Sequence, residues 1–251
     1  MSLVTPIHEA DLDFDNGTFD SASFAAQTLA GWQTLAGIID HTLLKPEATR
    51  DQIENLCDEA IRYRFACAMV NPIWASAAVS VLSGTGIPVG VTIGFPLGAS
   101  LVSTLRTEAT TLTRLGVREL DMVMPIGQLK SGNYQAVQHT IDAVATVAHH
   151  HGALLKVILE TCLLNVEEKL RASEIAIQAG ADFIKTSTGF STGGATPADV
   201  ALMRGVAGAR VGVKAAGGIR TLADVRALLE AGANRIGASA SVAIVRELGA
   251  E

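Results

Sequence analysis

Eight short apolar segments alternate with longer segments of helical periodicity from residue 37 to the end of the chain. The short segments are rich in Val and Ile and nearly continuous, which is typical of parallel strands buried on both faces. We expect strands over 38–40, 66–70, 88–93, 119–124, 154–159, 182–186, 211–215 and 235–238. Eight strand–helix units in a chain of 251 residues predict a closed (β/α)8 TIM barrel. A doubly wound open sheet is the alternative, but no glycine-rich dinucleotide fingerprint follows the first strand.

Several helix starts are marked by residues that satisfy free backbone N–H groups. Thr49 forms a capping box with Gln52, Asn165 forms a similar pair with Glu168, and Pro197 suits a first helical turn. Further helices are expected over 103–115, 134–150 and 241–248.

The segment before residue 37 lies outside this alternation. Residues 1–20 are acidic and irregular, and we expect them to form a mobile lead-in. Residues 21–35 have helical periodicity and predict one extra helix that caps the barrel floor. We therefore expect a single barrel domain over 21–251 that includes this N-terminal helix.

Charge and cysteine usage exclude several classes of protein. The net charge of −6, without a basic cluster, argues against nucleic acid as a partner. The longest apolar runs fall well short of a membrane span. The three cysteines form an odd set without metal-ligand spacing, which is typical of reduced thiols. Because the N-terminus also lacks a basic segment followed by an apolar core, we expect a cytoplasmic protein.

Three lysines occupy matching positions in successive expected strands. Lys156, Lys185 and Lys214 are each 29 residues apart, which is one strand–helix unit. Neighbouring strands lie about 5 Å apart, so the three side chains can share one cavity. Burial and a cationic neighbour both favour a neutral amine, the form that attacks a carbonyl to give a Schiff base. A lone strand lysine is more often structural, and the repetition is what favours a functional role.

Two aspartates belong to the same strands. Asp121 lies within the fourth expected strand and Asp40 ends the first. Each is either a buried partner that neutralises a lysine or a group that moves protons at the reacting carbon. Glu160 is a weaker candidate, for which we favour a structural role.

Glycine-rich loops follow the last two strands. Gly217 and Gly218 come after the seventh, and Gly237 and Ser239 come at the end of the eighth. Glycines let backbone N–H groups approach an anion, and this end of a TIM barrel is a common phosphate site. Arg220 is a further candidate for this site.

Together these residues closely resemble the deoxyribose-phosphate aldolase family of class I, Schiff-base enzymes. The matching segments are Ile39-Asp-His-Thr-Leu-Leu-Lys-Pro46, Gly94-Phe-Pro-Leu-Gly98, Glu119-Leu-Asp-Met-Val-Met124, Lys156-Val-Ile-Leu-Glu-Thr161, Phe183-Ile-Lys-Thr-Ser-Thr-Gly189, Val213-Lys-Ala-Ala-Gly-Gly218 and Ile236-Gly-Ala-Ser239. Seven ordered segments from residue 37 onward are far more specific than any one motif.

The resemblance implies reversible cleavage of 2-deoxy-D-ribose 5-phosphate to D-glyceraldehyde 3-phosphate and acetaldehyde, a lyase reaction of deoxyribonucleotide catabolism. It implies that Lys185 forms the Schiff base, Lys214 lowers its pKa and Asp121 relays protons. The implied substrate contacts are Asp40, Lys156, Thr186, Gly189, Gly217, Gly218, Gly237 and Ser239. The resemblance calls for no metal and no organic cofactor, and a homodimer or homotetramer is expected.

One position departs from the family pattern. Relatives often carry a cysteine three residues before the proline of Asn71-Pro72, where this chain has Met69. A thiol near the cavity adds to crotonaldehyde, the product of acetaldehyde self-condensation, whereas a thioether does not. We therefore expect this chain to tolerate acetaldehyde better than relatives with the thiol.

Two other functions remain open on the residues alone. A pyridoxal-phosphate barrel also needs a lysine imine and a phosphate site, and it would be yellow. A non-catalytic sugar-phosphate sensor would bind without turnover, but it leaves the lysine triplet without a purpose.

Overall fold

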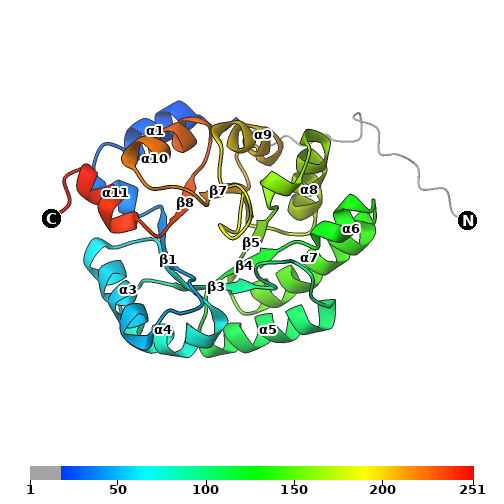
Figure 1. Cartoon of the computed structure of the whole chain (residues 1–251), viewed down its shortest axis with the longest axis horizontal. Helices are drawn as coiled ribbons and strands as arrows, with labels where there is room; N and C mark the ends of the chain where they lie inside the picture. The colour runs from blue at the N-terminus through cyan, green and yellow to red at the C-terminus, as the bar shows by residue number, and fades with distance from the viewer. Residues whose placement is uncertain (1–17) are drawn as a thin grey trace, which may run out of the picture.

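The computed structural model describes residues 18–251, so the lead-in expected over 1–20 lies outside the described residues except for its last three. Eight parallel strands pair in chain order from β1 to β8, and β8 pairs back with β1 (Figure 1). The predicted TIM barrel is therefore confirmed, and the open-sheet alternative is wrong.

The strands are β1 (Ile39–Leu43), β2 (Cys67–Val70), β3 (Val89–Ile93), β4 (Glu119–Val123), β5 (Leu154–Ile158), β6 (Phe183–Lys185), β7 (Gly212–Ala216) and β8 (Arg235–Ala238). The helices that follow them are α3 (Arg50–Tyr63), α4 (Ala75–Leu82), α5 (Val102–Leu115), α7 (Tyr134–His150), α8 (Val166–Gln178), α9 (Pro197–Ala207), α10 (Leu222–Glu230) and α11 (Ser241–Glu247). A short helix that we did not expect, α6 (Ile126–Lys130), lies between β4 and α7.

Capping residues start the helices where the sequence predicts them. The side chain of Thr49 accepts the N–H of Gln52 ahead of α3, and that of Asn165 accepts the N–H of Glu168 at 2.9 Å ahead of α8. In both cases the side chain at the third helical position bonds back to the cap backbone, which completes a capping box.

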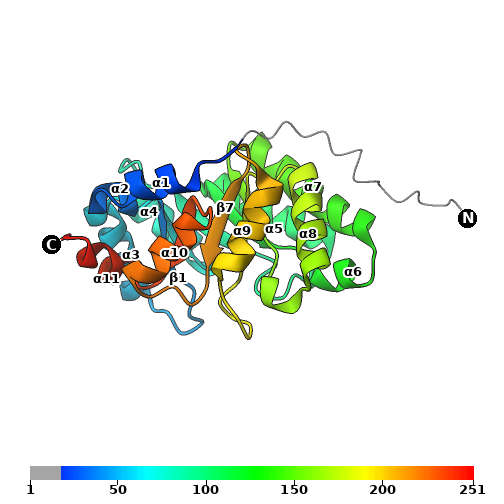
Figure 2. The ribbon, with the colours of Figure 1, turned by 90° about the horizontal axis from the view of Figure 1, so that it is seen from above.

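The segment before β1 forms two helices, α1 (Ser21–Thr28) and α2 (Trp32–Ala36), so the single helix expected over 21–35 is wrong. Gly31 separates them in an extended conformation, with φ −163° and ψ 154°. The hydroxyl of Thr34 donates to the carbonyls of Thr28 and Gly31, and these bonds hold the bend. Helix α1 packs on α10 and α2 on α11, on the opposite side of the molecule from the loop after β6 (yellow in Figure 2).

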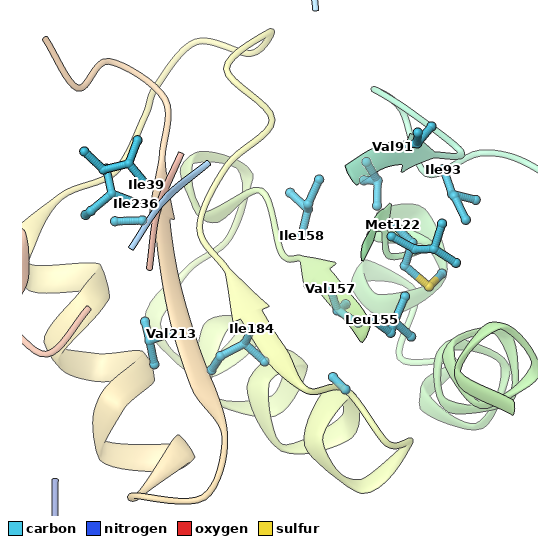
Figure 3. Close-up of a cluster of buried hydrophobic side chains, with 14 of the residues drawn as sticks. Ile39, Val91, Ile93, Met122, Leu155, Val157, Ile158, Ile184, Val213 and Ile236 are labelled. Carbon is cyan, nitrogen blue, oxygen red and sulfur yellow. The ribbon is translucent and has the colours of Figure 1, made fainter. Parts of the chain in front are cut away.

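Alternation along the strands separates an apolar layer from a polar interior. The strand side chains that face the helices include Ile39, Met122 and Val213, which are fully buried in the continuous core between barrel and helices (Figure 3). Their strand neighbours Asp40, Asp121 and Lys214 take the opposite parity and point into the barrel. The barrel interior is therefore where the charges of the strands gather.

Within residues 18–251, no helix combines the length and apolar character needed to cross a membrane.

Candidate active site

A cavity of about 270 Å³ opens at the carboxyl ends of the strands. Its walls come from the ends of β1, β6, β7 and β8 and from the loops that follow them. The lining residues are Thr42, Leu43, Leu44, Lys45, Lys185, Thr188, Gly189, Phe190, Lys214, Ala216, Gly217, Gly218, Ile219, Gly237, Ala238 and Ser239. This end of a TIM barrel is where catalytic groups are found, because the βα loops can vary without disturbing the barrel.

Lys185 and Lys214 reach the cavity from adjacent strands, in direct register with each other. The Nζ atoms of Lys185 and Lys214 lie 2.7 and 2.6 Å from Oδ2 of Asp121, which approaches from β4. Asp121 is fully buried, and Lys185 is 3% exposed. One carboxylate oxygen thus holds two amines together beneath the cavity.

Burial is the main cause that lowers the pKa of Lys185 to about 8. The charge of Asp121 opposes this shift, while the nearby charges of Lys214 and Lys156 add to it. Burial raises the pKa of Asp121, but the three surrounding lysines lower it more and hold it well below the usual range. The site therefore pairs a carboxylate that is ionised at neutral pH with an amine that is partly neutral near physiological pH.

Below these groups lie two charged residues that the sequence reasoning missed, Arg235 and Glu119. Arg235 donates from Nη2 to both oxygens of Glu119 at 2.8 Å and from Nε to Oδ1 of Asp40 at 2.6 Å. Glu119 also lies 2.6 Å from Nζ of Lys156. Strand parity could have found both, since Glu119 is two residues before Asp121 and Arg235 two before Gly237, on the same inward face.

Several residues expected to contact substrate lie beneath the cavity and do not line it. Lys156 is fully buried between Asp121, Glu119 and Asp40. Asp40 has both oxygens engaged, one by Arg235 and the other by Lys214 and Lys156. The hydroxyl of Thr186 bonds to the backbone of Ala216, at 3.1 Å from both its carbonyl oxygen and its nitrogen.

The glycine loops that were expected to hold a phosphate do line the cavity. Gly217 and Gly218 have φ values of 89° and 80°, in the left-handed region that favours glycine. Gly189 and Ser239 lie on the same cavity wall, and both are exposed. Arg220 is absent from the lining, whereas Lys45, which we had not singled out, supplies an exposed ammonium at the rim.

Comparison with known proteins identifies the family. Residues 34–247 match the model of the DeoC/LacD family aldolases. The chain belongs to this aldolase family. A deoxyribose-phosphate aldolase from Lysinibacillus sphaericus is 52% identical over 216 residues, which cover 86% of this chain and 96% of the relative. Another, from Thermoanaerobacter sp., is 52% identical over 214 residues, or 85% of this chain and 96% of the relative.

A solved structure supports the same assignment. The tetrameric deoxyribose phosphate aldolase from Aeropyrum pernix superposes with a TM-score of 0.84 at 34% identity. The match covers 91% of this chain and 96% of that chain. The eight-stranded barrel described above is therefore the fold of an aldolase relative as well.

Glu160, at the end of β5, has a structural position in this aldolase. It is 2% exposed and has φ 56° and ψ 63°, a conformation that is strained for a residue with a Cβ. Its carboxylate accepts both the N–H and the hydroxyl of Thr188 in the loop after β6. Glu160 thereby ties the loop that carries Gly189 to the strand beside it.

His41, His149 and Cys67 are not among the residues that line the cavity. His41 points outward and bonds to Glu59 of α3 at 2.8 Å. His149 of α7 bonds to Asp182 at 2.9 Å. Cys67 faces the barrel interior next to Met69, and burial raises the pKa of its thiol well above the usual value. A thiol held protonated in this way is a poor nucleophile.

Proposed function

We propose that this chain is a class I aldolase that reversibly cleaves 2-deoxy-D-ribose 5-phosphate to D-glyceraldehyde 3-phosphate and acetaldehyde. Lys185 is the nucleophile. The observation that carries this assignment is the buried contact of Lys185 with Asp121 at 2.7 Å beside Lys214, on the floor of a cavity lined by glycine loops. The family and the names of the relatives at 52% identity support the substrate.

The reaction starts from the open-chain sugar. The neutral amine of Lys185 adds to the aldehyde carbon C1, and loss of water gives an iminium. A base removes the proton from the C3 hydroxyl, the C2–C3 bond breaks, and its electron pair moves to the iminium to form an enamine. Glyceraldehyde phosphate leaves, C2 is then protonated, and hydrolysis of the iminium releases acetaldehyde and restores the amine.

Asp121 and Lys214 support these proton transfers. Oδ2 of Asp121 is within hydrogen-bond distance of both amines, so it can accept a proton from one while the other stays charged. The ammonium of Lys214 disfavours a second positive charge on Lys185 and so favours the neutral nucleophile. We assign Asp121 to the proton relay and Lys214 to tuning the pKa of Lys185.

The phosphate binds at the open end of the cavity. Backbone N–H groups around Gly217, Gly218 and Gly237 and the hydroxyl of Ser239 are the donors, and Lys45 adds a positive charge at the rim. Asp40, Lys156 and Thr186 lie beneath the cavity and support it. Asp40 pairs with Lys156 and Lys214, and the hydroxyl of Thr186 joins the end of β6 to β7 through the carbonyl of Ala216.

The deciding experiment is borohydride trapping with 2-deoxyribose 5-phosphate, followed by peptide mass mapping. The expected result is a reduced adduct on Lys185 alone, with its loss in Lys185→Met and its retention in Lys130→Met, a surface lysine bonded to Glu168. We expect Lys185→Met to lose at least about 1000-fold in kcat. An adduct on Lys214 or Lys156 would reverse the assigned roles, and folded protein without an adduct or turnover would indicate a sugar-phosphate sensor.

Assembly and location are proposed on the same basis. We expect a cytoplasmic homodimer or homotetramer, supported by the tetrameric relative from Aeropyrum pernix. Light scattering at several concentrations would test this, and a mass equal to one chain throughout would contradict it.

A further inference from the structure

Seven charged side chains meet inside the barrel, and we call them the buried charge network. Three are carboxylates and four are cations: Asp40, Glu119, Asp121, Lys156, Lys185, Lys214 and Arg235. With Lys185 neutral the six remaining charges cancel, whereas its protonation leaves one uncompensated positive charge in the interior. An uncompensated buried charge is costly, so the sum of charges in the network bears on the state of Lys185.

The contacts are unequally shared among the four cations. Lys156 lies within 3.3 Å of three carboxylates, and Lys214 and Arg235 each contact two. Lys185 contacts only Asp121, at 2.7 Å, and shares that oxygen with Lys214. Lys185 is therefore the cation of the network with the fewest carboxylate contacts.

The floor of the barrel shields most of this network from water. Gly212 leaves the room that the Phe183 ring occupies, since a Cβ there would overlap the ring. The Arg235 guanidinium lies 6.0 Å from the centre of that ring, and its side chain is 13% exposed. Because solvent screens buried charges only weakly, a change of charge at the floor changes the electrostatic potential at Lys185.

We propose that Arg235 and Glu119 are positioning residues that set the protonation state of Lys185 from the barrel floor, without touching it. The charge of Arg235 acts on Lys185 through a chain of ion pairs. Arg235 contacts Asp40, Asp40 contacts Lys214, and Lys214 shares Asp121 with Lys185. The catalytic consequence rests on the proposed function, but the protonation of Lys185 can be measured without it.

The other titratable groups around β6 belong to different interactions. Glu160, beside the end of β5, is bonded to Thr188, and Lys45 stands at the exposed rim. On the outer helices Lys169 and Asp199 pair with each other at 2.6 Å. From within the barrel, Lys185 faces Asp121, Lys214 and Lys156.

Competitive labelling of the full chain with trace acetic anhydride tests the proposal, because only the neutral amine reacts. Labelling of Lys185 is measured by peptide mass mapping across pH, against a free amine as reference. Arg235→Met removes one positive charge, so the labelling midpoint is expected to rise by about one pH unit, which is a tenfold change in neutral fraction. Glu119→Gln removes one negative charge and is expected to lower the midpoint.

Two further variants separate charge from structure. Arg235→Met combined with Glu119→Gln restores the balance of charges, so its midpoint is expected to return to that of the parent. Arg235→Lys keeps the charge and is expected to leave the midpoint in place. If circular dichroism shows that Arg235→Met does not fold, the proposal is tested by the expected downward shift of the labelling midpoint in Glu119→Gln.

An unchanged midpoint in the folded single variants would overturn the proposal, as would a double variant that keeps the shift of a single one. A purely structural role would lower labelling or activity at every pH without moving the midpoint. Failure of the proposed aldolase reaction would show instead as absent turnover with the labelling shifts intact.

Discussion

Two opposing effects set the protonation state of Lys185. Burial disfavours the charge, and Asp121 at 2.7 Å favours it. The second amine, Lys214, competes for the same carboxylate oxygen and tips the balance towards the neutral form. A partly neutral amine is thus obtained from three side chains on three strands.

The pH dependence of the reaction follows from this balance. Since the pKa of Lys185 is about 8, kcat/KM should rise with pH up to about 8 and then level off as the neutral fraction saturates. Asp121 raises the pKa of Lys185, so Asp121→Asn should move the acid limb to lower pH while it lowers kcat. A pH–rate profile of both proteins checks this, and a parent profile without a limb near pH 8 would contradict it.

Met69 bears on inactivation by aldehydes. It is fully buried with Cys67, next to the cavity residue Leu44. Crotonaldehyde needs a thiolate to add to, and the Cys67 thiol is held protonated by burial. Position 69 is two residues nearer the cavity along β2 and pairs with the cavity residue Thr42, whereas Cys67 pairs with Asp40 beneath the cavity. We expect the parent to keep its activity in concentrated acetaldehyde several-fold longer than Met69→Cys. Residual activity over time is the measurement, and rapid loss in the parent with an adduct on Cys67 would disprove the explanation.

Lys45 is the cation that we propose to contact the substrate phosphate. Lys45→Ala removes a charge at the cavity rim, so KM for deoxyribose 5-phosphate should rise about tenfold, the effect of losing one charge-assisted hydrogen bond. The kcat/KM for unphosphorylated deoxyribose should stay the same. Lys130→Ala is the matched control. Equal losses on both substrates would argue against a phosphate contact.

At the scale of elements, the loops after β6 and β7 fit together through glycine. Ala195 donates to the carbonyl of Gly217 at 3.0 Å, and a Cβ on Gly194 would overlap that same carbonyl oxygen. Glu160, which follows β5, also bonds to Thr188 and so fixes the loop after β6 to the neighbouring strand. The loop after β6 and the loop after β7, which carries the expected phosphate donors Gly217 and Gly218, are therefore held as one unit, and this limits their freedom before substrate binds.

Gly194→Ala tests this fit. The overlap should force the loops apart, with a loss of about 1–3 kcal/mol in the free energy of unfolding and a higher KM for the phosphorylated substrate. Gly205→Ala is the control, because this exposed glycine of α9 has open space around it and should gain up to about 1 kcal/mol. Denaturant unfolding and steady-state kinetics on both variants provide the comparison. A Gly194→Ala protein as stable as the parent would refute the fit.

For the whole molecule, the buried charges link stability to pH. Neighbouring cations hold the pKa values of Asp40 and Asp121 below their unfolded values. A carboxylate of this kind stabilises the fold above its unfolded pKa, about 3.9, and the contribution is lost as pH falls towards the folded value. The melting temperature should therefore change little from these groups above about pH 5 and fall steeply below about pH 4.

Asp40→Asn should remove part of this acid-sensitive stability. It leaves Lys214 and Arg235 short of a buried partner, so we expect a loss of about 3–5 kcal/mol at neutral pH and a shallower decline in acid. Asp58→Asn, at an exposed position of α3, should change neither. Melting curves across pH measure both effects, and equal acid sensitivity in all three proteins would contradict this account.

The sequence alone determined the barrel and the placement of three lysines on neighbouring strands. Near-continuous apolar strands at regular spacing allow few folds, and lysines one unit apart must lie on neighbouring strands. Capping residues such as Thr49 and Asn165 act on N–H groups three residues away, so the helix starts could be predicted from local sequence.

The tertiary structure decided which charges meet. Contacts between Asp121 and Lys185, or between Arg235 and Asp40, depend on strand register and on how far side chains reach across the barrel. Those distances join residues far apart in the chain, so no local pattern encodes them. For the same reason only the structure shows that Asp40 and Lys156 lie beneath the cavity and that Lys45 lines it.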